Sequence, residues 1–143
     1  MQKTIPTVGV IAISENRVLL VRHEEGAGHI TGIYGLPSGR IDNDESEQQA
    51  AAREFHEETG LYAKDIDFKE FKNNYYVADI PRKDGTIKRF GWRVFRVQNF
   101  YGDLTSSDET TPEWIEISNL SKLEREKRLL PNTLLVVMEV MKQ

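Results

Sequence analysis

The stretch Gly39–Leu61 constrains this chain more than any other part of its sequence. It reads GRIDNDESEQQAAAREFHEETGL, in which a turn with a dense acidic run leads into a predicted helix that stops at Gly60. Ser46 is a candidate N-cap, and the three consecutive alanines favour helix, so we expect a helix over Ser46–Thr59. Any fold of this chain must therefore accommodate one strongly acidic helix.

The predicted helix has an acidic side and a packing side. At about 100° per residue, three carboxylates fall on one side: Glu54, Glu57 and Glu58. Ala50 and Ala51 lie on that same side and are small. The packing side consists of Ala52, Phe55 and Thr59. We therefore expect one side of the helix to face the core, while the adjacent side gathers negative charge beneath open space.

This clustering of carboxylates is unfavourable unless something neutralises it. Like charges three or four residues apart destabilise a helix by a few tenths of a kcal/mol per pair, and near the C-terminus they also oppose the helix dipole. A hard cation such as Mg²⁺ takes oxygen ligands, whereas zinc prefers nitrogen and sulfur, and His56 projects away from this side. The alternative is a solvated acidic face with surface ion pairs, such as Arg53 with Glu57.

The acidic helix belongs to a longer pattern that decides between these two interpretations. The pattern is G-x5-E-x7-R-E-U-x-E-E-x-G-U, where U is a bulky apolar residue. All nine specified positions are filled, by Gly39, Glu45, Arg53, Glu54, Phe55, Glu57, Glu58, Gly60 and Leu61. This is the complete Nudix box, and the chain therefore resembles the Nudix hydrolases. Phe55 stands where an aliphatic residue is usual, and Ser38 stands where glycine often precedes the box.

The resemblance implies a reaction and a set of site residues. Nudix hydrolases split a nucleoside diphosphate linked to another moiety, and they use Mg²⁺, with Mn²⁺ as an alternative. The implied metal ligands are the carbonyl of Gly39 and the side chains of Glu54, Glu57 and Glu58. Glu54 or Glu58 would also orient or deprotonate the attacking water. Arg53 would hold a glutamate in place, and Glu45 would act from the outer shell or the helix start.

Many members of the family use a further glutamate from a loop. Glu109 and Glu113 are the candidates here, and both lie in or beside the predicted loop 102–112. We prefer Glu109 as a catalytic residue because of its place in the loop. The alternative for each is an ordinary surface carboxylate.

The substrate is less constrained than the reaction. ADP-ribose hydrolases often carry a proline about fifteen residues after the box, where this chain has Tyr76. Dinucleoside polyphosphate hydrolases often carry a tyrosine slightly further along, and Tyr75 and Tyr76 do not match that position. We therefore expect a pyrophosphohydrolase acting on a nucleoside triphosphate or a related nucleotide. The alternatives are an ADP-ribose or dinucleoside polyphosphate hydrolase, and a non-catalytic nucleotide sensor.

The rest of the chain predicts a mixed α/β domain. A length of 143 residues suits a single domain over 1–143. Strands are expected at Thr7–Ile13, Arg17–Arg22, Ile33–Leu36, Ile66–Ile80, Ile87–Phe100 and Trp114–Ile117. A closing helix is expected at Pro131–Met141. With the resemblance, this order implies a Nudix-type α/β/α sandwich with a mixed sheet and flanking helices.

Composition narrows the expected location and partners. The net charge of −4 argues against general nucleic-acid binding, and the absence of cysteine suits a reducing cytoplasm. The longest apolar runs are far short of the ~20 residues of a membrane span. We therefore expect a cytoplasmic protein with a small nucleotide as its partner and no membrane association. Homodimers are frequent among the proteins it resembles.

Overall fold

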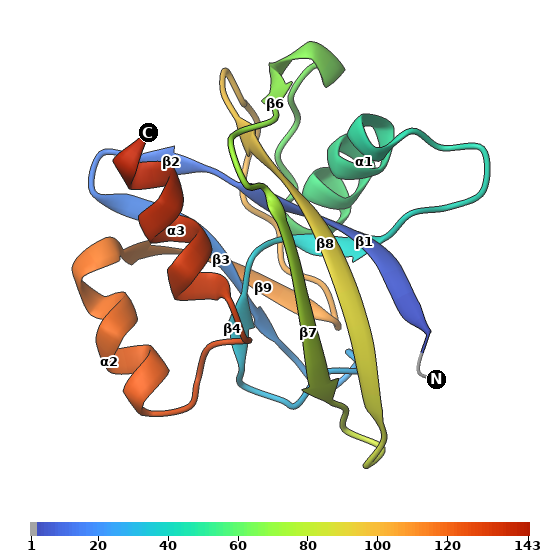
Figure 1. Ribbon diagram of the computed structural model, residues 1–143. Coiled ribbons are helices and arrows are strands. Elements are labelled where there is room, and N and C mark those ends of the chain that lie inside the picture. The colour runs from blue at the N-terminus through green and yellow to red at the C-terminus, as the bar shows by residue number, and fades with distance from the viewer. Residues whose placement is uncertain (1–2) are drawn as a thin grey trace.

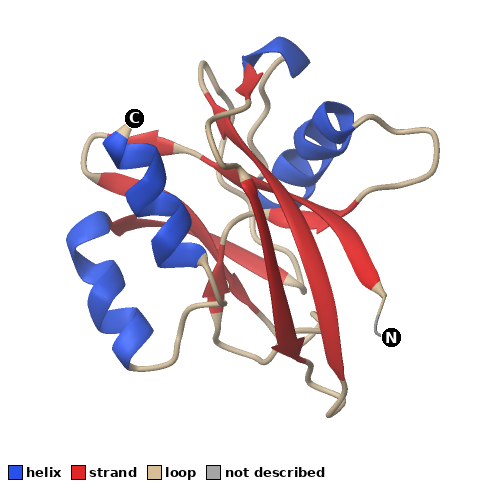
Figure 2. Cartoon of the chain, in the orientation of Figure 1, coloured by secondary structure: helices blue, strands red, loops and turns tan. Residues whose placement is uncertain are grey.

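The computed structural model describes residues 3–143 as strands layered between helices (Figures 1 and 2). Sheet A contains β1 (Thr4–Ile11), β5 (Ser38–Arg40), β6 (Phe68–Lys69), β7 (Tyr75–Pro81) and β8 (Ile87–Val97). Sheet B contains β2 (Ile13–Ser14), β3 (Arg17–His23), β4 (Tyr34–Gly35) and β9 (Thr110–Glu116). The α-helices are α1 (Glu47–Thr59), α2 (Leu120–Arg125) and α3 (Thr133–Lys142), and short 3₁₀ turns lie at Asp65–Asp67 and Ile117–Asn119. In Figure 1, α1 lies on one side of the strands, and α2 and α3 lie on the other.

Sheet A is mixed, and its interior strands are β1 and β8. One edge of β1 runs parallel to β8, and the other edge pairs antiparallel with β5. The register sets Thr7 between Trp92 of β8 and Arg40 of β5. The same register brings Gly39 opposite Val8, so the first residue of the Nudix box is itself part of the sheet. Sheet B is antiparallel throughout.

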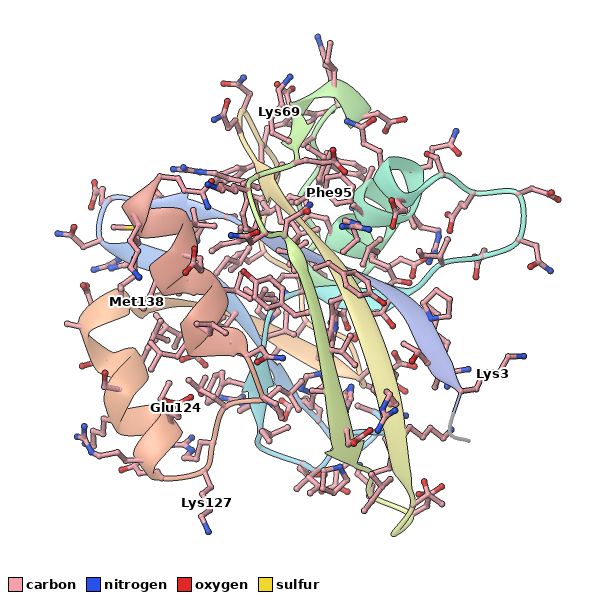
Figure 3. All side chains as sticks on the ribbon, viewed as in Figure 1. Lys3, Lys69, Phe95, Glu124, Lys127 and Met138 are labelled. Carbon is pink, nitrogen blue, oxygen red and sulfur yellow. The ribbon has the colours of Figure 1, made fainter. Side chains whose placement is uncertain are left out.

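The two faces of sheet A bury two different hydrophobic clusters. On β8, alternation sends Phe90, Trp92 and Val94 toward sheet B and α3, and Phe95 and Val97 toward α1. Figure 3 shows Phe95 beside α1. A strand covered on both faces is apolar along its length, which is why β1 reads as an unbroken run of small and β-branched residues. The predicted sandwich with a mixed sheet and flanking helices is confirmed.

The predicted strand Ile66–Ile80 is wrong, because the chain turns in its middle. A 3₁₀ turn precedes β6, and β7 starts only at Tyr75. Asn73 has a φ of 61°, a left-handed conformation that asparagine tolerates better than most residues. The buried Asn74 amide donates to the carbonyl of Val94 at 2.9 Å, which fixes the turn against β8. The aromatic residues of this stretch favoured a single strand, although Asn73 and Asn74 interrupt it.

Three elements near the C-terminus also differ from the expectation. Strand β9 begins at Thr110, inside the predicted loop 102–112, because its residues pair with β3 as far as His23. Helix α2, which buries Leu120, was not predicted. The closing helix starts at Thr133, because Asn132 before it has a left-handed φ of 72°. None of the helices within residues 3–143 is long and apolar enough to cross a membrane.

Candidate active site

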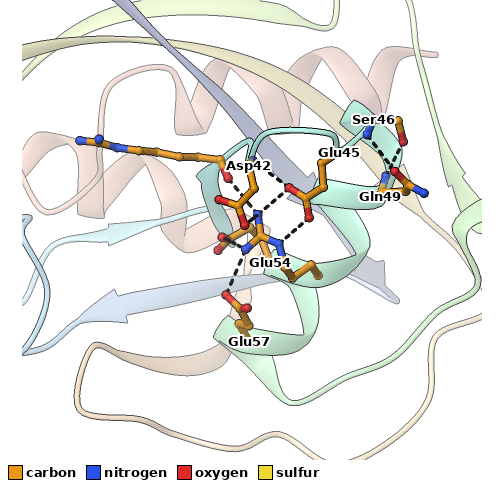
Figure 4. Close-up of polar contacts among 8 residues, drawn as sticks. Asp42, Glu45, Ser46, Gln49, Glu54 and Glu57 are labelled. Carbon is orange, nitrogen blue, oxygen red and sulfur yellow. Dashed lines mark hydrogen bonds and ion pairs between the residues drawn. The ribbon is translucent and has the colours of Figure 1, made fainter.

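Helix α1 is bounded as the sequence predicts. The Ser46 hydroxyl accepts the N–H of Gln49 at 3.0 Å, and the Gln49 side chain accepts the N–H of Ser46 at 2.9 Å (Figure 4). This capping box satisfies two backbone donors at the start of the helix. At the other end, Gly60 has a left-handed φ of 86° and closes the last turn on the His56 carbonyl. The caps therefore fix where the helix begins and ends.

The packing side of α1 is broader than the helical projection predicts. Phe55 and Thr59 are fully buried, as expected. Ala50 and Ala51 are also fully buried, so the space above them is filled by the core and not left open. Ala52 is only half-buried. Two small residues side by side let the helix approach sheet A closely, which carries the neighbouring carboxylates toward the interior as well.

Arg53 forms ion pairs with each of the four acidic side chains that are labelled in Figure 4. Its guanidinium donates to Glu45 at 2.6 and 2.8 Å, to Glu54 at 2.5 Å and to Glu57 at 3.3 Å. It also donates to the carbonyl of Arg40 at 3.0 Å, which ties α1 to β5. The hydrogen bonds from Arg53 lower the pKa of Glu45 to about 2. Arg53 therefore makes contacts that can orient glutamates, and its part in the reaction stays a prediction.

The Glu54 carboxylate sits directly against Gly39. A Cβ atom on residue 39 would fall 2.1 Å from the Glu54 carboxyl carbon, so only glycine leaves room here. The side chain of Glu54 is 12% exposed. Burial raises the pKa of Glu54 to about 7 despite the opposing effect of Arg53. The surrounding protein groups therefore stabilise the charged form of Glu54 less well than water does.

Glu58 is the more strongly perturbed carboxylate. It accepts the backbone N–H of Ser38 at 2.7 Å. Burial raises the pKa of Glu58 to about 8, and the nearby charges of Glu54 and Glu109 add to that rise. Glu57 differs, because its side chain is 55% exposed and contacts Arg53. The three glutamates predicted as metal ligands therefore occupy three different environments.

A cavity of about 390 Å³ brings most of the predicted site together. Its lining includes Gly39, Glu54, Glu57, Glu58 and Glu109. Arg53 is absent from this lining and acts from behind it. Glu113 lies elsewhere on β9, where it accepts from Arg22 at 3.2 Å and from the Tyr34 hydroxyl at 3.3 Å. The geometry thus places Glu109 at the cavity and gives Glu113 partners away from it.

Further side chains complete the lining of the cavity. Among them are His23, His29, Phe90 and Trp92. Arg82 lines the cavity too, and sequence reasoning missed it. It stands directly after β7, in the turn that leads to β8, so only the fold shows that this hairpin reaches the site.

The donor set suits a hard divalent cation. The lining glutamates and the Gly39 carbonyl offer oxygen, the ligand that Mg²⁺ prefers. The raised pKa values of Glu54 and Glu58 indicate carboxylates held without enough positive charge around them. No three acidic or histidine side chains within residues 3–143 converge into a finished metal cluster. The chemistry of these residues therefore fits a Mg²⁺ ion, although their side chains do not converge on one point.

Without a divalent cation, the stability of the protein is expected to fall as the pH rises from about 5 to about 8. The folded pKa values of about 7 for Glu54 and about 8 for Glu58 lie above the ordinary value of 4.5. The folded state therefore keeps protons that the unfolded chain has released, and this stabilisation is lost as the pH passes 7 and then 8. We expect the Tm in EDTA to fall on the order of 5 °C over this range.

Adding Mg²⁺ should reverse the fall, with a larger gain in Tm at pH 8 than at pH 5. Thermal unfolding followed by circular dichroism, with EDTA or Mg²⁺ at each pH, measures both effects. Glu58→Gln removes one of the titrating groups, so its profile in EDTA should be flatter. A Glu58→Gln profile as steep as that of the unaltered chain would contradict the assignment of the effect to this carboxylate.

Comparisons with known proteins agree with this fold. A sequence model of the NUDIX domain matches residues 3–133. The chain belongs to the Nudix family. In the solved structure of the E. coli ORF135 protein the fold is similar, with a TM-score of 0.71 and 20% identity over 99% of this chain and 91% of that one.

Two curated relatives have different names. The oxidized purine nucleoside triphosphate hydrolase of Danio rerio is 30% identical over 119 residues, which are 78% of this chain. The ADP-ribose pyrophosphatase of Methanocaldococcus jannaschii is 30% identical over 121 residues, which are 82% of this chain. The matches span 65% and 66% of these relatives' own lengths.

Proposed function

We propose that this chain is a metal-dependent pyrophosphohydrolase that acts on a nucleoside diphosphate linked to another moiety. The observation that carries the proposal is the single cavity in which three box glutamates and Gly39 share a wall. Phe90 and Trp92 line the same cavity, with ring centroids 5.7 Å apart, and could pack against a base. The cavity thus offers one region for phosphates and another for an aromatic group.

Each residue of the acidic wall has its own part in the proposed reaction. Glu54, Glu57 and Glu58, with the carbonyl of Gly39, would hold Mg²⁺ or Mn²⁺. The bound ion would neutralise charge on the phosphate oxygens and lower the pKa of a water. Glu58 or Glu54 would also orient that water or accept its proton. Glu109 would assist from the loop, and Arg53 would keep Glu54 and Glu57 in place.

A nucleoside triphosphate or a related nucleotide is the substrate we favour. The two curated relatives are named for an oxidized purine nucleoside triphosphate and for ADP-ribose, so family membership leaves this choice open. The proline typical of ADP-ribose hydrolases is absent after the box, where Tyr76 stands. ADP-ribose and dinucleoside polyphosphates are the alternative substrates, and a sensor without turnover is the alternative function.

A substrate panel tests this proposal. Nucleoside triphosphates, ADP-ribose, dinucleoside polyphosphates and NADH are incubated with the protein and Mg²⁺, and the products are separated and identified. We expect cleavage of a phosphoanhydride bond, strongest for a triphosphate. The Glu57→Gln, Glu58→Gln double variant, purified in parallel, controls for contaminating phosphatases. If the unaltered chain hydrolyses none of these compounds, the sensor interpretation replaces the enzyme.

A further inference from the structure

The lining of the cavity also carries positive charge. Arg82 and Arg40 line the same cavity as the box glutamates. Arg82 comes from the β7–β8 turn, where its backbone N–H bonds the Thr86 carbonyl at 2.7 Å. Arg40 comes from β5, directly after Gly39. One cavity therefore has an acidic side and a basic side.

Several contacts fix the Arg82 guanidinium in place. It lies over the ring of Phe90, 5.6 Å from the ring centroid, and one terminal nitrogen is 3.3 Å from a ring nitrogen of His29. A Cβ atom on residue 28 would fall 1.9 Å from its other terminal nitrogen, so Gly28 leaves the room it occupies. The guanidinium thus lies against an aromatic ring and an imidazole, in the space that Gly28 leaves in the loop between β3 and β4.

This basic side has no matching acid. Among residues 3–143, no carboxylate forms an ion pair with Arg82 or Arg40. The charge of Asp84 raises the pKa of Arg82, but the Asp84 carboxylate accepts a hydrogen bond from the Thr86 hydroxyl at 2.7 Å. Burial lowers the pKa of Arg82, and the charge of Arg40 lowers it further, yet a guanidinium stays protonated.

The neighbouring histidines add no compensating charge. Burial lowers the pKa of His29 to about 3 and also lowers that of His23, so both imidazoles are neutral near pH 7. A partly buried cation without a partner is unfavourable, and a second cation beside it makes the position worse. An anion entering the cavity would satisfy both guanidinium groups at once.

We propose that Arg82, assisted by Arg40, binds a phosphate group of the substrate that lies beyond the two phosphates at the acidic wall. The inference rests on the proposed function, and it makes substrates with three or more consecutive phosphates the preferred class. ADP-ribose has only two phosphates, with a neutral ribose at its far end, and offers this basic side no anion. A nucleoside triphosphate offers one phosphate more than the acidic wall requires.

Binding of inorganic polyphosphates tests the inference without relying on turnover. Titration calorimetry on the full chain in Mg²⁺ compares inorganic tripolyphosphate with pyrophosphate. Because a charge-assisted hydrogen bond contributes about a factor of ten, we expect the full chain to bind tripolyphosphate at least ~10-fold tighter. Arg82→Ala should reduce this preference to within about twofold by removing that bond. Arg82→Lys, which keeps the charge, should retain part of it.

Lys83→Ala is the matched control. Lys83 stands next to Arg82 in the same turn and holds the same loop, through the carbonyl of Glu25 at 2.7 Å, but it does not line the cavity. We expect this variant to keep the full preference for tripolyphosphate. Equal weakening of both ligands in Arg82→Ala would show a merely structural role and overturn the inference.

Titration of the unaltered chain also tests the inference, and it does so even if Arg82→Ala does not fold. Lack of any preference between the two polyphosphates in that chain would itself overturn the inference. The outcome is separate from that of the substrate panel. A chain that hydrolyses nothing but prefers tripolyphosphate refutes the proposed function and keeps the basic subsite. A chain that hydrolyses nucleotides with no such preference keeps the function and refutes the subsite.

Discussion

Replacing Glu58 with glutamine is expected to lower kcat at least ~100-fold on whichever substrate the panel identifies, because a charged partner of the reacting groups is lost. The change is nearly isosteric, and the amide oxygen of glutamine can still accept the Ser38 N–H that Glu58 accepts at 2.7 Å. The fold should therefore be retained. Steady-state kinetics in saturating Mg²⁺, with circular dichroism of the same preparation, measures both properties.

Two further variants sharpen this test. Glu57→Gln should also lower kcat at least ~100-fold, because Glu57 belongs to the same proposed metal site. Glu47→Gln is the matched control on the same helix, since Glu47 pairs with Arg93 at 3.4 Å and does not line the cavity. Its rate should be unchanged. Unaltered rates in both Glu57→Gln and Glu58→Gln would refute the metal assignment.

Phe55→Ala should lower the free energy of unfolding by about 3–5 kcal/mol, the range for removing a large buried aromatic side chain. Phe55 is fully buried on the sheet-facing side of α1. Its ring meets Phe68 and Phe100 edge-on, with centroids 5.8 and 6.2 Å away. Because these partners belong to separate segments after the helix, the cavity left by alanine would not easily close. Urea unfolding followed by circular dichroism measures the change.

The size of the replaced group can be separated from its position. Phe55→Leu keeps most of the volume with the aliphatic chemistry more usual at this place in the box, so we expect a loss of about 1–2 kcal/mol. Ile66→Ala, at a side chain that is 68% exposed, should change stability by no more than about 0.5 kcal/mol. A loss below about 1 kcal/mol in Phe55→Ala would contradict the packing described for α1.

Local signals in the sequence predicted the helix and its boundaries well. Ser46 and Gly60 act through contacts within a few residues, so their roles can be read without knowing the fold. The period of two along a strand accounts for the faces of β8, with Phe90 and Trp92 on one face and Phe95 and Val97 on the other. The acidic side of α1 followed from helical geometry, and its chemistry followed from the resemblance of the complete box.

Features that depend on distant segments were not predictable in this way. The burial of Ala50 and Ala51 depends on how closely sheet A approaches α1, which no helical projection contains. Arg82 reaches the cavity only because β7 and β8 form a hairpin that extends to the loop between β3 and β4, where Arg82 pairs with His29. The separation of Glu109 from Glu113 follows from the pairing of β9 with β3, which leaves one at the cavity and the other on a strand.

The parallel pairing of β1 with β8 has a consequence for the order in which a new chain acquires its site. The Nudix box is complete once Leu61 has been synthesised, yet β5, which carries Gly39, is held by β1. The other edge of β1 pairs with β8, and β8 is complete only when Val97 has been synthesised. Contacts between segments so far apart form late, after a large entropic barrier. A ribosome-bound chain that ends before β8 would therefore hold every proposed metal ligand and still lack the framework that gathers them.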